Sequence, residues 1–292
     1  MTLEEIIKNK ESNLSKIPDK LLTDIQKAEK GIYGKVVTLL NRLKKDSDGN
    51  LIISKSNIAI SSEIVNELKT IVLTKDYLDS LREFINGMDE QALANDAYFA
   101  KIFDNFKISA TADAVLERAK TAALDQLLGA PMEAEFVKPM ADIIDTAISS
   151  GNSFADLSSQ IKDFVLGTPE VDGKLASYSS QVSYDSFAFA DRAYTNIISE
   201  EMGAEWYVWN GRLLETSRPF CEDRKGKYFH YKEIEAMADL EWQGKAEGTN
   251  AQTIFIVAGG YRCIDSILPV SISVVPDDVV QRNIDNGNYE VT

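Results

Sequence analysis

The hydrophobic period of this chain changes once along its length, close to Gly203. Before Gly203, apolar residues recur every three to four positions in segments separated by polar or glycine-bearing breaks, which is typical of amphipathic helices. After it, residues 206–209 and the Asn210-Gly211 pair have the pattern of a strand that enters a hairpin. The sequence therefore predicts an α+β fold, with a helical region over residues 1–203 and a small C-terminal α+β domain over residues 204–292 that contains antiparallel strands.

The helical region divides into segments at glycines and turn residues. We expect Gly87 and Gly151 to stop helices, and Ser153 with Asp156 to open one as a capping box. Gly31 and Gly34 lie inside the first helix, where each costs about 1 kcal/mol relative to alanine. Helices are expected over residues 19–45, 62–73, 76–85, 90–103, 112–128 and 174–202, with a helical pair over residues 133–166.

Beyond the helices, three further runs have a strand-like pattern. They are residues 212–215, which return from the hairpin, and residues 253–257 and 270–275. One short helix is expected over residues 231–240.

Composition restricts the function classes. Lys and Arg total 31 against 46 for Asp and Glu, so the net charge is −15 and a broad nucleic-acid surface is not expected. No apolar run reaches the roughly 18–20 residues that cross a bilayer, and Glu4 and Glu5 stand where a signal peptide would be basic and then apolar. We therefore expect no membrane partner and a chain that stays where it is made.

Chemistry-bearing residues gather in two segments, residues 216–229 and 253–263, which we call the two motif segments. They contain both cysteines, and the single histidine follows the first segment directly. Pro219 holds Arg218 extended, so its guanidinium can reach carbonyls or carboxylates of the turn at Gly260. The residues expected to form this structural motif are Arg218, Pro219, Phe220, Cys221, Arg224, Gly226, Gly259, Gly260 and Cys263.

These motifs resemble a known family. The order Thr-Ser-Arg-Pro-Phe-Cys, Arg-x-Gly-Lys-x-Phe, Trp242 with Gly244, and a Gly-Gly-Tyr-x-Cys turn before Leu268 is similar to the C-terminal domain of tailed-phage minor head proteins, also called head-morphogenesis or Mu F-like proteins. The resemblance covers residues 154–276, and its sharper motifs lie beyond Trp206. Family members usually show Asn-Cys-Arg-His or Cys-Arg-Cys at the second motif, whereas this chain has Arg-Cys-Ile-Asp at residues 262–265.

The resemblance implies a structural role. It implies a low-copy virion protein, a minor capsid protein on the inner side of the portal vertex, which acts in head assembly and passes through the host cytoplasm. Its partners would be the portal protein and other capsid proteins. Membership of this family does not imply an enzyme.

The residues leave a metal site open as an alternative. Cys221, His230 and Cys263 are ligand types that suit zinc, and Asp265 or Asp223 would supply a fourth ligand. The spacing lacks the ligand pairs, two to four residues apart, of structural zinc sites, so no cofactor is the first expectation. On the other interpretation the cysteines are semi-buried residues that the fold brings together, and His230 is a surface or helix-start residue.

Two further hypotheses follow from the same residues. If the two thiols lie within reach of each other, we expect oxidation outside the cell to link them. The alternative function is a metal-dependent hydrolase or nuclease that uses Cys221, His230, Cys263 and Asp223. A nucleophilic mechanism fits poorly, because the single histidine would have to serve as its base.

Overall fold

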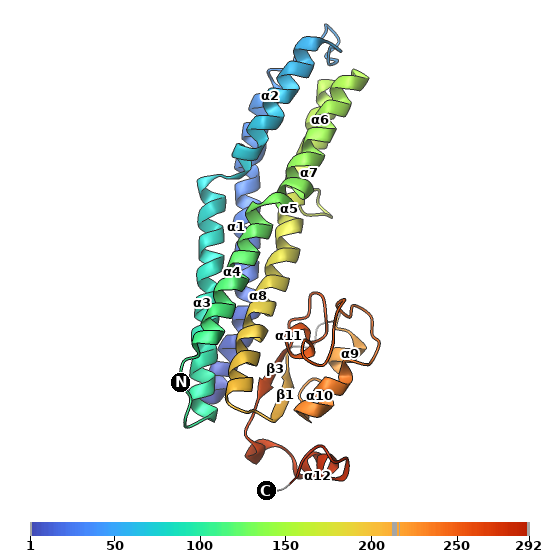
Figure 1. Cartoon of the computed structure of the whole chain (residues 1–292). Helices are drawn as coiled ribbons and strands as arrows, with labels where there is room; N and C mark the ends of the chain where they lie inside the picture. Colours follow the sequence, from blue (N-terminus) through green and yellow to red (C-terminus); the bar gives the residue numbers. More distant parts are fainter. Residues whose placement is uncertain (1, 212–214, 216, 291–292) are drawn as a thin grey trace. The chain divides into compact units, whose positions relative to one another are not determined.

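The computed structural model describes residues 2–211, 215 and 217–290. It has an α+β fold, as expected: helices occupy most of the chain up to Glu201, and a three-stranded antiparallel sheet follows (Figure 1). The long helices are α1 (Leu3–Leu40), α2 (Lys55–Val72), α3 (Lys75–Ile102), α4 (Ala110–Leu128), α6 (Lys138–Ser150), α7 (Phe154–Leu166) and α8 (Lys174–Glu201). The short ones are α5 (Ala130–Met132), a π-helix (Glu133–Val137), α9 (Pro219–Glu222), α10 (Tyr231–Met237), α11 (Ile254–Val257), a 3-10 helix (Ile272–Val274) and α12 (Asp277–Asp285). None of the helices among the described residues is long and apolar enough to span a bilayer.

The chain forms two compact units. One comprises Met1–Ile17, Asn86–Thr121 and Tyr184–Thr292, and the other comprises Pro18–Ile85 and Ala122–Ser183. The division passes through α1, α3, α4 and α8. Residue 203 thus marks the change from helices to strands, while the compact units divide the chain at other positions.

Several helix limits differ from those expected. α1 begins at Leu3 and runs through Gly31 and Gly34, and α2 begins at Lys55 because the Ser54 side chain accepts a hydrogen bond from the backbone N–H of Asn57. The stop expected at Gly87 is wrong, since α3 continues through it. A Cβ at Gly87 would lie 2.6 Å from Cγ2 of Ile17, so this glycine permits close packing against α1 instead of ending a helix.

The helical pair over residues 133–166 is confirmed in α6 and α7. Gly151 ends α6 in the left-handed conformation, with φ of 64°. The Ser153 side chain then accepts from the backbone N–H of Asp156 at 3.0 Å and opens α7.

The sheet has the order β2-β1-β3, with β1 (Trp206–Asn210) between β2 (Tyr228–His230) and β3 (Ser266–Pro269). Both pairings are antiparallel, and Tyr207 lies opposite Phe229 on one side and Pro269 on the other. The short helix expected over residues 231–240 is present as α10. Of the expected return strand over residues 212–215, residues 212–214 lie outside the described residues, and Glu215 is in a turn.

Two expected strands are wrong. Residues 254–257 form α11, which the side chain of Asn250 helps to start by accepting from the N–H groups of Gln252 and Thr253. Residues 270–275 do not form a strand: β3 ends before them, at Pro269, and the Ser271 side chain caps the 3-10 helix that follows. In both cases local hydrogen bonds from a side chain to the backbone, in the turn at Asn250 and in the cap at Ser271, outweigh the β-propensity of valine and isoleucine.

The hydrophobic core of the C-terminal part contains both cysteines. Its buried residues are Tyr207, Trp209, Phe220, Cys221, Ile234, Met237, Ala238, Ile254, Ala258, Cys263 and Ile267. This core joins β1 and β3 with α9, α10 and α11. The candidate site therefore lies inside a packed core.

Candidate functional site

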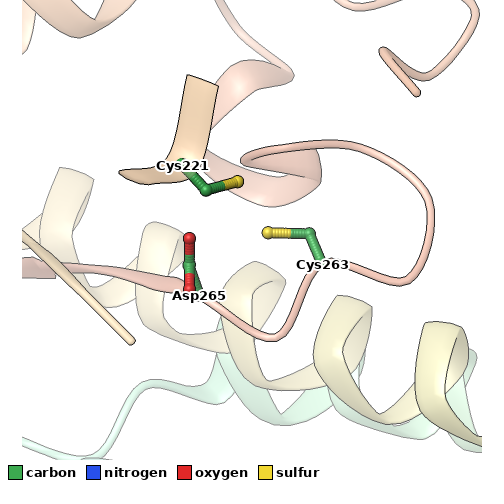
Figure 2. A group of neighbouring side chains, drawn as sticks. All are labelled: Cys221, Cys263 and Asp265. Carbon is green, nitrogen blue, oxygen red and sulfur yellow. The ribbon is translucent and has the colours of Figure 1, made fainter. Parts of the chain in front are cut away.

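The fold brings Cys221 and Cys263 together with Asp265. Their candidate ligand atoms all lie within 4.8 Å of one another, and all three residues are buried. Figure 2 shows the two sulfur atoms pointing toward each other, with the Asp265 carboxylate beside them. Cys221 comes from α9, Cys263 from the loop before β3, and Asp265 directly precedes β3. We call these three residues the thiol cluster.

The first motif segment positions Cys221 through its neighbours. Pro219 is the first residue of α9, and Arg218 before it is extended, with φ of −80° and ψ of 146°. The Phe220 ring stacks on Trp242 with ring centroids 3.9 Å apart, and the Arg224 guanidinium lies 3.7 Å from the Phe220 ring centroid. Phe220 therefore fixes α9, and α9 carries the Cys221 thiol into the core.

Gly226 closes the first motif segment. Its φ of 72° is in the left-handed region that favours glycine. Its N–H donates to the backbone oxygen of Trp209 at 2.7 Å. The segment thus returns to β1 before β2 begins.

The second motif segment needs glycine at two positions. A Cβ at Gly259 would overlap the Cys221 sulfur and lie 3.0 Å from the Cys263 sulfur. Gly260 has φ of 96°, and a Cβ there would overlap the backbone oxygen of Gly244. Both thiols thus face the bare backbone of Gly259, which explains the Gly-Gly pair in the motif.

Arg218 makes the contact expected from the sequence. Its Nη1 donates to the Gly259 oxygen at 3.3 Å, and its Nη2 donates to the Tyr261 oxygen. The indole N–H of Trp242 donates to the same Gly259 oxygen at 2.9 Å. Hydrogen bonds from these side chains to one turn therefore hold the two motif segments together.

Trp209 and Arg192 fix the remaining part of the thiol cluster. The Trp209 indole N–H donates to Oδ2 of Asp265 at 2.9 Å. Nη1 of Arg192, which is buried in α8, donates to the backbone oxygens of Cys263 and Asp265 at 2.9 and 3.0 Å. The loop before β3 is thus tied to a helix and to the central strand.

The two thiols ionise as a pair. A hydrogen bond from the Cys221 thiol to the Cys263 sulfur raises the pKa of Cys221, and burial raises it further. The same hydrogen bond lowers the pKa of Cys263, helped by the Arg192 guanidinium and opposed by burial. Because one proton remains between two sulfurs, the pair loses its first proton more readily than its second.

Thiolate and carboxylate groups in this arrangement suit a zinc ion, with three of the four ligands of a tetrahedral site. Within the described part of the chain, the thiol cluster is the one group of three or more such side chains close enough to hold a metal. His230 and Asp223 are not members of it. The structure thus brings together three of the residues named as candidate ligands, Cys221, Cys263 and Asp265.

His230 has a different place. It precedes α10, where its Nδ1 accepts from the backbone N–H of Lys232 at 3.4 Å, and it is buried against Trp206 with ring centroids 5.1 Å apart. It is a helix-start residue, as one interpretation expected, although it is not on the surface. Asp223 is exposed at the end of α9.

A buried polar network continues from the thiol cluster into the helices. Oδ1 of Asp191 accepts from the side-chain amides of Gln91 at 2.8 Å and Asn95 at 2.9 Å. The same oxygen lies 3.7 Å from Nζ of Lys10, and burial lowers the pKa of that lysine. Oδ2 of Asp191 accepts from the Ser266 hydroxyl at 3.2 Å. The start of β3 is therefore anchored to α1, α3 and α8.

Sequence reasoning missed Arg192, Trp209 and Asp191 as supports of this site. The pattern of residues 206–209 indicates only a strand for Trp209, although a buried indole must find an acceptor. The available signal for the other two was the charged pair Asp191-Arg192 inside the apolar stripe of α8, since buried charges need partners.

Comparisons of the chain with protein-family models, with curated proteins and with solved structures find no match. The functional argument therefore depends on the motif residues and on the geometry they adopt.

Proposed function

We propose that this chain is a structural virion protein, a minor head protein that acts in head assembly near the portal vertex. The observation that carries the proposal is the closed packing of the two motif segments. Arg218 and Trp242 both donate hydrogen bonds to the carbonyl of Gly259, and both thiols are buried against that residue. These are the residues on which the resemblance to minor head proteins depends, so the motif has a structural explanation in this fold.

Such packing suits a folded anchor for assembly. Hydrogen bonds that hold a turn and stacked aromatic rings keep the core of this part of the chain rigid, and a rigid module loses little conformational entropy on binding. The proposed partners are the portal protein and other capsid proteins, met in the host cytoplasm during assembly and retained in the virion. With a net charge of −15, complementary basic surfaces on those partners would guide association.

The alternative of a metal-dependent hydrolase or nuclease has less support from the geometry. A catalytic metal needs an open coordination position for water and substrate. Of the four residues named for it, Cys221 and Cys263 are buried in the core, while His230 and Asp223 lie outside the thiol cluster. The grouping of Cys221, Cys263 and Asp265 is the observation that favours a metal at this place.

Two measurements test the proposal. The chain is co-expressed with the portal protein encoded in the same genome, purified through a tag on the portal, and analysed by size-exclusion chromatography with light scattering. Mass spectrometry of gradient-purified virions is the second measurement. We expect a stable complex and the chain's peptides in virions at low abundance.

The contradicting result is equally specific. It would be the absence of the chain from both the portal complex and virions, together with metal-dependent phosphodiester hydrolysis that Cys263→Ser abolishes. The Arg118→Ala variant, changed at an exposed position of α4, serves as the control for both measurements.

A further inference from the structure

The thiol cluster holds both cysteines of the sequence, each buried and each facing the other. Their sulfur atoms lie within 4.8 Å, whereas a disulfide bond is about 2 Å long. Gly259 lies against both sulfurs, and because it has no side chain, no side-chain atom of this residue separates them. Closing the gap therefore requires local movement of two thiols that already point at each other.

We propose that Cys221 and Cys263 form a redox pair, in which a low-molecular-weight disulfide oxidises both thiols and joins the two motif segments covalently. The proposal concerns the chain itself and does not depend on a role in the virion. It extends the packed contact between the segments into a bond that depends on the redox conditions.

The chemistry balances through two exchange steps. A transient local opening of the loop before β3 exposes the thiolate of Cys263, which is buried in the closed core. This thiolate attacks one sulfur of the small disulfide, breaks its S–S bond and releases one small thiolate. Cys221 loses its proton and attacks the Cys263 sulfur of this mixed disulfide, which forms the internal bond and expels the second small thiolate. Two protein thiols are oxidised, one small disulfide is reduced to two small thiols, and no other reactant is needed.

The surroundings support this order of events. Nη1 of Arg192 donates to the backbone oxygen of Cys263 at 2.9 Å, so a positive charge lies beside this residue, and the two sulfurs point toward each other. Arg218 and Trp242 both donate to the oxygen of Gly259, which limits how far Cys221 and Cys263 move apart when the loop opens. The fold thus supplies a high effective concentration of one thiol at the other.

The link would enclose a substantial part of the domain. The segment between the two cysteines contains β2, α10 and α11, a loop of roughly 40 residues. Closing a loop of this length removes conformations from the unfolded chain and so favours the native state. By linkage, the native state favours the disulfide to the same degree that the disulfide favours the native state.

The experiment uses the purified full chain equilibrated with glutathione and glutathione disulfide at increasing ratios. Samples are quenched with acid, denatured, treated with N-ethylmaleimide and weighed as intact protein. We expect a monomer that takes up no maleimide or glutathione and is about 2 Da lighter than the reduced chain. The equilibrium constant for this species should be on the order of 100-fold larger for native protein than for protein in urea.

Matched variants keep the result interpretable. Cys221→Ser and Cys263→Ser should give single glutathione adducts and no internal link. Gly259→Ala, whose methyl group would overlap the Cys221 sulfur, should lower the native equilibrium constant. Gly34→Ala, where no atom lies within 4 Å of the added Cβ, should leave the constant unchanged.

Three outcomes would overturn the proposal. The first is an equilibrium constant for native protein equal to or below that in urea. The second is oxidation that yields dimers or two glutathione adducts in place of the internal link. The third is stoichiometric zinc that native protein retains after dialysis and that blocks the link, because the thiols would then be metal ligands.

Discussion

Replacement of Arg218 by alanine tests whether the two motif segments hold each other in place. The guanidinium donates to the carbonyls of Gly259 and Tyr261, and hydrogen bonds of charged donors contribute about 1.5–3 kcal/mol when they are lost. The Gly259 oxygen keeps the indole N–H of Trp242 as a partner, and Tyr261 is exposed, so water replaces part of the loss. We therefore expect Arg218→Ala to destabilise the protein by about 1–2 kcal/mol.

Tryptophan fluorescence during urea denaturation measures this loss selectively. All three tryptophans, Trp206, Trp209 and Trp242, lie in the C-terminal part, beside the motif segments. Arg218→Lys should lose about half as much, since lysine keeps the charge but not the planar arrangement of donors. The exposed Arg118→Ala on α4 should stay within about 0.5 kcal/mol of the parent protein.

The reasoning would be refuted by an unfolding midpoint of Arg218→Ala that matches both Arg118→Ala and the parent. If the midpoint is unchanged while binding to the portal protein falls, Arg218 belongs to a contact surface instead.

Three further predictions concern other supports of the fold. Trp209→Phe should lower the free energy of unfolding, measured in urea, by about 2–3 kcal/mol, because the buried Asp265 carboxylate loses its indole donor. A loss below about 0.5 kcal/mol would contradict that role. Gly259→Ala should destabilise the protein by about 1–3 kcal/mol, because its methyl group meets both sulfurs. Gly34→Ala in α1 should stabilise the protein by about 0.5–1 kcal/mol, and equal unfolding midpoints for the two variants would contradict this difference. Burial raises the pKa of Glu29 from 4.5 to about 7, so the native state binds this proton more tightly than the unfolded state does. Stability should therefore fall by about 2–3 kcal/mol as pH rises from about 4.5 to 7, and Glu29→Gln should remove this part of the pH dependence when denaturation is repeated across that range.

The fold class was predictable because the hydrophobic period changes at Gly203, and the change reflects real burial on helices and strands. Helix limits were predictable where a cap decides them, as at Ser153. Gly87 was misleading because a glycine inside a helix that packs closely on a neighbour has the same sequence signal as a glycine that ends a helix. Sequence alone does not show which neighbour is present.

The site was predictable in part for a similar reason. The proline before Cys221 fixes local backbone, so the reach of Arg218 to the Gly260 turn followed from short-range geometry. The partners of the thiols depend on sheet order, which brings Asp265 beside them and places His230 at the start of α10. The spacing of residues along the sequence does not give the order of the strands, and here β2 and β3 pair with opposite edges of β1.

The most direct test of the central claim is the rate at which iodoacetamide alkylates the thiols of the native, reduced chain across pH 6–9, a range set by the usual thiol pKa of about 8.5. The account predicts that both thiols react on the order of 100-fold more slowly than in urea, because Cys221 and Cys263 are buried in a core held by Arg218 and Trp242. One thiol that reacts near pH 7 as fast as a free low-pKa cysteine would contradict it, since an accessible thiolate belongs to a reactive cleft and not to a packed core.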